Sequence, residues 1–173
     1  MRSLSLLVVT FALGLATACE EQDSCTRALE VDTHLEIGEG EQELTLIENL
    51  DRVPVSQGSQ GGNHIWIGVR TSGIAPGRRG TIGRAAEAGP DIVFDLLDST
   101  GARIGDGGVS ETPLVGDELE ADLIGAELFV DSWEGDNDGG EESDEEALYT
   151  LRATLLDRCG TELIAERQVY LDW

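Results

Sequence analysis

Basic charge is scarce in this sequence, and lysine is absent altogether. Among its 173 residues, 11 arginines face 35 aspartates and glutamates, and the net charge is −24. A chain this acidic repels phosphate backbones, so its composition argues against nucleic-acid binding. The same repulsion disfavours anionic lipid surfaces as electrostatic partners. Cations and basic protein surfaces are the partners that this charge favours.

The common catalytic motifs are also missing. The sequence has no nucleophile elbow, no phosphate-binding loop, no zinc-type histidine pair and no Cys-x-x-Cys. Its many carboxylates would allow a glycosidase-type pair, but no pattern singles one out. We therefore predict no catalytic residue and a protein that is not an enzyme.

No apolar run is long enough to cross a bilayer as a helix. The longest, Leu4 to Leu15, falls well short of that length. It follows Arg2 and leads through Ala16-Thr17-Ala18 to Cys19. A basic start, a short apolar run and small residues before a cleavage point are typical of an export signal, here residues 1–18.

The end of this signal resembles the lipobox of bacterial lipoproteins, in which small residues directly precede a cysteine. The resemblance implies cleavage before Cys19 and attachment of lipid to it. Ala16 departs from the pattern, because leucine is commonest there. Glu20 implies sorting to the outer membrane, since aspartate at that position is the usual retention signal. Ordinary export with cleavage near Ala18 is the alternative.

Two further cysteines, Cys25 and Cys159, remain after the signal. An exported compartment is oxidising, so an even pair predicts a disulfide, with two free thiols as the alternative. We expect residues 19–28 to form a short tether and residues 29–173 to form one domain. An apolar content of 40% is enough for its core.

The clearest strand runs through Gly61–Arg70. Ile65, Ile67 and Val69 alternate with His64 and Trp66, and this period of two predicts a central strand. Further strands are expected in Leu29–Ile37, Ile92–Leu97, Leu119–Leu123, Leu128–Val130, Tyr149–Leu155 and Leu163–Leu171, with no convincing helix.

Short strands separated by glycine, aspartate and proline predict an all-β fold. We expect an antiparallel β-sandwich, immunoglobulin-like in the broad sense. A jelly roll or a small barrel would give a similar count of strands.

The segment Gln60–Arg70 resembles a strand of uncharacterised secreted lipoproteins from delta-proteobacteria, in which a Gly-Gly-x-His element leads into an aliphatic strand ending in arginine. Their late strands are similar to Leu148–Val169, with an Asp-x-x-Gly turn at Asp157–Gly160. The resemblance implies an exported immunoglobulin-like domain, and it implies no activity and no functional residue.

Histidine is scarce, and His64 shares a strand face with Trp66. If His34 converged on them, a transition metal could bind, but two histidines without a free thiol form a poor site. Packing of a satisfied histidine beside a tryptophan is the favoured interpretation.

An acidic segment matches the spacing of an EF-hand calcium loop, with glutamate where aspartate is usual at the first position. The matching residues are Glu134, Asp136, Asp138, Gly139, Gly140, Glu142 and Glu145. Such a composition also matches by chance, so a solvated hairpin tip is the simpler interpretation. Calcium is the one cofactor that the sequence allows, and no other is expected.

These patterns predict an outer-membrane lipoprotein whose acidic β domain is a binding or structural module. Its expected partners are the membrane, through the lipid, and an unidentified envelope or extracellular protein. A calcium-dependent adhesion or ligand-binding module that uses Glu134 to Glu145 is the alternative function, and an envelope hydrolase ranks third. Because Cys159 ends the strand that follows the acidic segment, that segment should lie far from the disulfide.

Overall fold

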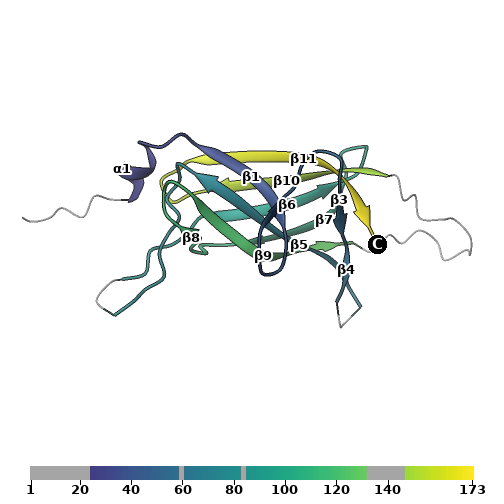
Figure 1. The fold of residues 1–173 in the computed structure, drawn as a ribbon, viewed down its shortest axis with the longest axis horizontal. Helices are drawn as coiled ribbons and strands as arrows, with labels where there is room; N and C mark the ends of the chain where they lie inside the picture. Colours follow the sequence, from purple (N-terminus) through teal and green to yellow (C-terminus); the bar gives the residue numbers. More distant parts are fainter. Residues whose placement is uncertain (1–23, 59–60, 83–84, 132–146) are drawn as a thin grey trace, which may run out of the picture.

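A computed structural model of the chain describes residues 24–58, 61–82, 85–131 and 147–173. These ranges contain one short helix and eleven strands (Figure 1). The elements are α1 (Ser24–Ala28), β1 (His34–Glu39), β2 (Thr45–Leu46), β3 (Asp51–Pro54), β4 (Ser56–Gln57), β5 (Asn63–Ser72), β6 (Asp91–Leu97), β7 (Arg103–Val109), β8 (Val115–Gly116), β9 (Ala121–Val130), β10 (Leu148–Leu156) and β11 (Glu162–Asp172). The all-β prediction is confirmed.

All eleven strands belong to one hydrogen-bonded sheet. Its order is β2-β1-β5-β9-β7-β6-β10-β11-β3, with β4 paired to β5 and β8 paired to β9. Every pair is antiparallel except β3 with β11, which run parallel. The expected antiparallel arrangement therefore holds for every described pair but this one, and the sheet is mixed.

The sheet curls until its two ends approach each other. Segment 45–54 lies between β1 and β11 and bonds to both. The Ile47 amide donates to the Ile37 carbonyl of β1, and the Leu50 amide donates to the Gln168 carbonyl of β11. One short stretch of chain thus pairs antiparallel to β1 through β2 and parallel to β11 through β3. This explains the single parallel pair.

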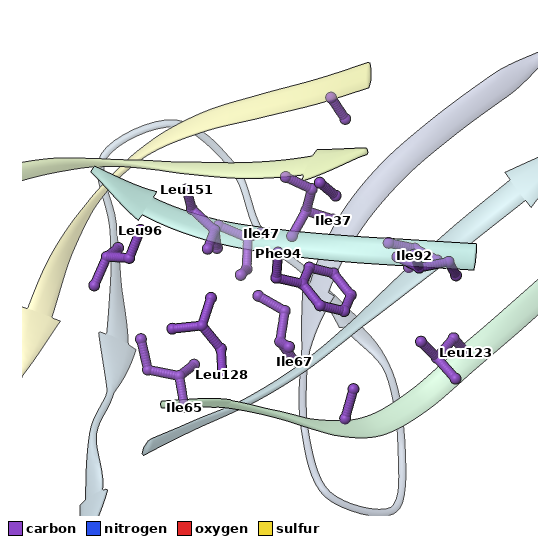
Figure 2. Packing of buried hydrophobic residues seen from close by; sticks show 14 of the residues in the cluster. Ile37, Ile47, Ile65, Ile67, Ile92, Phe94, Leu96, Leu123, Leu128 and Leu151 are labelled. Atoms are coloured by element: carbon purple, nitrogen blue, oxygen red, sulfur yellow. The ribbon is translucent and has the colours of Figure 1, made fainter. Parts of the chain in front are cut away.

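The concave side of the curled sheet encloses the core. Figure 2 shows Phe94 among side chains from other strands, including Ile37, Ile67 and Leu128. These four residues are fully buried. Strict alternation on β6 and β10 places one set of side chains in this core and leaves the other set on the convex, outer face.

Two hairpins of the sheet use the same turn. Asp98 and Asp157 each begin an Asp-x-x-Gly sequence, and one carboxylate oxygen of each accepts amide hydrogens from the second and fourth following residues. Gly101 and Gly160 close the turns at φ 83° and 85°, a conformation that glycine adopts without strain. The Asp-x-x-Gly turn expected at Asp157–Gly160 is confirmed, and Asp98 begins a second turn of the same kind.

The N-terminal part differs from the expectation. A strand was expected over Leu29–Ile37, but helix α1 ends at Ala28 and the first strand begins only at His34. Leu29 is 82% exposed, so its place in the alternating pattern was accidental. The helix occupies the last five residues of the stretch expected to be a tether.

Candidate functional site

His64 and Trp66 lie on the outer face of β5, where the sequence placed them together. Their rings meet edge to face, with centroids 5.1 Å apart. His64 is buried although it faces outward. Gly58 lies close to its ring, since a side-chain carbon built on Gly58 would lie only 3.7 Å from the His64 Nδ1 atom. The favoured interpretation, a histidine packed beside a tryptophan, agrees with this geometry.

His34 lies at the other end of the sheet. It pairs with Ser72, eight residues along β5 from His64, which is roughly 27 Å for an extended strand. The convergence of the two histidines on one metal is therefore wrong. Arg70 ends the Gly-Gly-x-His segment of β5. Its guanidinium donates two hydrogen bonds, of 3.0 and 2.9 Å, to the Asp122 carboxylate, and this pair joins β5 to β9.

Two residues of β9 lie beside His64 and Trp66 on the same face of the sheet. Phe129 is paired with His64, and Glu127 is paired with Trp66. Directly paired side chains stand about 5 Å apart on the same face of a sheet. The ring of Phe129 is 55% exposed. A large aromatic side chain is thus exposed to solvent beside the buried His64 and the partly exposed Trp66.

Three carboxylates surround Phe129. Asp106 on β7 is paired with Phe129 across the sheet, Glu127 precedes it by two residues on the same face, and Asp131 follows it by two residues. All three are exposed. We call Trp66, Asp106, Glu127, Phe129 and Asp131, together with His64, the Phe129 surface.

The carboxylates of the Phe129 surface have no cationic partner within the described part of the chain. No ion pair or side-chain hydrogen bond joins Asp106, Glu127 or Asp131 to a described residue. The next basic residue of this face, Arg103, is bound to Asp95 at 3.4 Å. The surface is therefore negatively charged around an exposed aromatic ring.

This arrangement suits an organic cation better than a metal ion. In the ranges that the structure describes, no three His, Cys, Asp or Glu side chains are grouped closely enough to hold a metal. Guanidinium and ammonium groups instead favour the face of an aromatic ring with carboxylates at its rim. The chemistry of the Phe129 surface is that of an acceptor for arginine or lysine side chains.

Sequence reasoning missed Phe129 because it lies in the apolar run Leu128–Val130, which was predicted as a strand without assigning its residues to the two faces. The sequence nevertheless contains a pattern that indicates the outward orientation of Phe129. Glu127, Phe129 and Asp131 alternate with Leu128 and Val130, and that alternation places Phe129 with the two acids on the outer face.

The disulfide between Cys25 and Cys159 is present, with Cα atoms 5.7 Å apart. It joins α1 to the turn between β10 and β11.

Arg78 and Arg158 both bind Glu87, at 2.9 and 3.0 Å. The charges of these two arginines are thus partly neutralised within the domain.

Two sets of predicted residues lie outside the described part of the chain. One is Cys19, the expected lipidation site. The other is the calcium-loop set Glu134, Asp136, Asp138, Gly140, Glu142 and Glu145. The strand ends that flank the acidic segment, Val130 and Leu148, lie at the end of the sheet away from Cys159, as expected.

A shallow hollow lies near that end, between the β6–β7 turn and the outer faces of β10 and β11. Its charged groups are already engaged. Asp98 accepts hydrogen bonds from Thr100 and Ala102, and these bonds hold the pKa of its carboxyl below the ordinary value. Arg152 binds Glu166 at 2.7 Å. Few of the charged groups that line the hollow are therefore free to bind a ligand.

Comparisons with known proteins give little guidance. No protein-family model matches the chain, and no curated protein matches it. Among solved structures, the chain is similar to the CooA pilin subunit from enterotoxigenic Escherichia coli, with 8% sequence identity and a TM-score of 0.35. The match covers 79% of this chain and 97% of the pilin subunit. So loose a likeness says nothing about what the chain binds.

Proposed function

We propose that the protein is a cell-envelope lipoprotein, anchored through Cys19, whose β domain is a binding module for a basic protein partner. The export signal and the small residues before Cys19 support the anchor. The observation that carries the binding role is Phe129, an exposed aromatic ring on a rigid sheet with Asp106, Glu127 and Asp131 around it.

The charge of the whole chain favours the same class of partner. A net charge of −24 draws basic surfaces toward the domain and speeds their encounter. Long-range attraction alone is not specific. The exposed ring adds a short-range contact, because an arginine side chain can stack on it while its guanidinium reaches a carboxylate.

Binding of a fluorescent oligo-arginine peptide, measured by anisotropy at low salt, tests this role. Phe129→Ala should weaken binding about twofold to fivefold, which corresponds to the usual free energy of an exposed cation–π contact. The double variant Asp106→Asn with Glu127→Gln should weaken it further and flatten the dependence on salt.

Ile164→Ala is the matched control, because Ile164 is a 60% exposed apolar residue elsewhere on the outer face. It should bind the peptide as the native chain does. Equal affinities for the native chain, Phe129→Ala and the double variant would show that the peptide responds only to overall charge, and the proposed surface would be wrong.

A further inference from the structure

The end of the domain that carries α1 has exposed apolar side chains close to the point of anchorage. Only residues 20–23 separate Cys19 from Ser24, where α1 begins. Five extended residue steps reach about 18 Å at most. The disulfide then fixes α1 to the β10–β11 turn. A lipid on Cys19 therefore holds this end of the domain near the bilayer.

Leu29 and Leu119 are two strongly exposed apolar residues of this end. They are 82% and 70% exposed. Arg27 of α1 binds Glu118 at 2.8 Å, which ties the helix just before Leu29 to the turn that carries Leu119. The Glu118 carbonyl also accepts a hydrogen bond from the Gly73 amide, so the turn is anchored to the end of β5.

Val115 extends the same group. It is 69% exposed and pairs with Asp122, beside the turn of Leu119. Figure 1 shows α1 and β8 at the same end of the molecule, with the C-terminus at the other end. Leu29, Val115 and Leu119 together form what we call the apolar tip.

We propose that the apolar tip rests in the interfacial region of the membrane once Cys19 is lipidated. This inference depends on the anchor proposed above. Exposed apolar side chains on loops gain by leaving water, and the short tether keeps them at high local concentration beside the bilayer. Seating the tip orients the domain with the C-terminal end, and the Phe129 surface beside it, away from the lipid.

The charge of the chain limits the lipid that fits. The apolar tip is surrounded by acids such as Glu30, Asp117 and Glu120. The nearby cations Arg27 and Arg70 are already paired, with Glu118 and with Asp122. Anionic headgroups would repel this end. Zwitterionic lipid is therefore the surface that the tip should enter.

Because the sequence contains no lysine, one introduced lysine provides a single side-chain amine for labelling. Leu119→Lys provides the only lysine amine, to which an environment-sensitive amine-reactive dye can be attached. Trp173→Lys is the matched control, since Trp173 is also exposed and lies after β11, about 34 Å of strand away from the disulfide-bonded turn. Both full-length proteins are purified from the envelope and mixed with phosphatidylcholine vesicles.

We expect both proteins to float with the vesicles. The dye at position 119 should brighten and shift to the blue at least twice as much as the dye at position 173. Adding phosphatidylglycerol should reduce the shift at position 119. Adding Leu29→Ser and Val115→Ser to the Leu119→Lys protein should also reduce it.

The two proposals fail in distinguishable ways. If both proteins float but the dye responds equally at positions 119 and 173, the anchor stands and the apolar tip does not enter the membrane. If neither protein floats, the anchor is absent, and the seating of the tip is overturned with it.

Discussion

At the scale of single residues, Asp157 and Asp98 show how burial changes the contribution of the same kind of turn to stability. Both carboxylates accept the same two backbone hydrogen bonds within an Asp-x-x-Gly sequence. Asp157 is almost fully buried and also accepts the Ala75 amide at 3.0 Å. It thus joins the β10–β11 turn to the loop after β5, whereas Asp98 is partly exposed.

Asp157→Ala should therefore cost more stability than Asp98→Ala. Removing Asp157 leaves buried amides without an acceptor, and we expect a loss of about 2–4 kcal/mol in the free energy of unfolding. Asp98→Ala should cost clearly less, because water replaces its bonds. Urea denaturation of both variants measures the difference. Equal losses would mean that the link from Asp157 to Ala75 contributes nothing.

Glu39 is a residue whose ionisation opposes folding. It ends β1 at the seam near Asp51, and its Oε2 atom is buried without a hydrogen-bond partner within the described ranges. Burial, helped by repulsion from Asp51, raises the pKa of the Glu39 carboxyl. A raised pKa in the folded state stabilises the protein below the unfolded pKa, and this stability is lost as the pH rises through the folded pKa.

Glu39→Gln should remove the loss of stability that accompanies ionisation of Glu39. We expect the variant to melt about 2–4 °C above the native protein at pH 7, from roughly 1 kcal/mol of relieved desolvation. The two proteins should converge at low pH, where Glu39 is protonated. Thermal melting from pH 3 to pH 8 measures both. A constant difference at all pH values would contradict the role assigned to Glu39.

At the scale of elements, alternation in the sequence predicted most of the sheet. Strands β5, β6, β10 and β11 lie where Ile65, Phe94, Leu151 and Val169 and their neighbours alternate with polar residues, because a half-buried strand needs that pattern. Helix α1 was missed, since five residues are too few to show a helical period.

Strand β9 was predicted as two runs, yet it is one strand of ten residues. Gly125 at φ 73° and the register shift between Ile67 and Val69 mark a bulge. The bulge interrupts the period of two while the strand continues. The parallel pairing of β3 with β11 was also beyond prediction, because it depends on how the sheet closes and not on either strand alone.

The disulfide is the covalent link between α1 and the sheet. Its cysteines are 134 residues apart, and in the chain-entropy model a closed loop of this length stabilises the folded state by about 5 kcal/mol. The double variant Cys25→Ser with Cys159→Ser should therefore unfold at a much lower urea concentration. An unchanged midpoint would mean that the two cysteines are reduced in the native protein.

At the scale of the whole molecule, the two ends of the curled sheet differ in chemistry. The α1 end carries the disulfide and exposed leucines, whereas the Phe129 surface and the strand ends flanking the acidic segment lie toward the other end. Within the described residues, no helix is long and apolar enough to pass through a membrane.

Of the candidate site, the sequence predicted His64 and Trp66 as neighbours but not the residues that give the surface its chemistry. Phe129 and Asp106 are brought together by the pairing of β9 with β7, a contact between strands that no local pattern encodes. The disulfide could be predicted because pairing followed from the compartment and the even number of cysteines. The calcium loop from Glu134 to Glu145 stays a prediction.

Lipidation of Cys19 underlies both the proposed location and the seating of the apolar tip, and metabolic labelling tests it most directly. Cells producing the native chain or Cys19→Ala are grown with a radioactive fatty acid, and the protein is immunoprecipitated. We predict label on the native chain and none on Cys19→Ala. Label on Cys19→Ala, or none on either chain, would contradict the account.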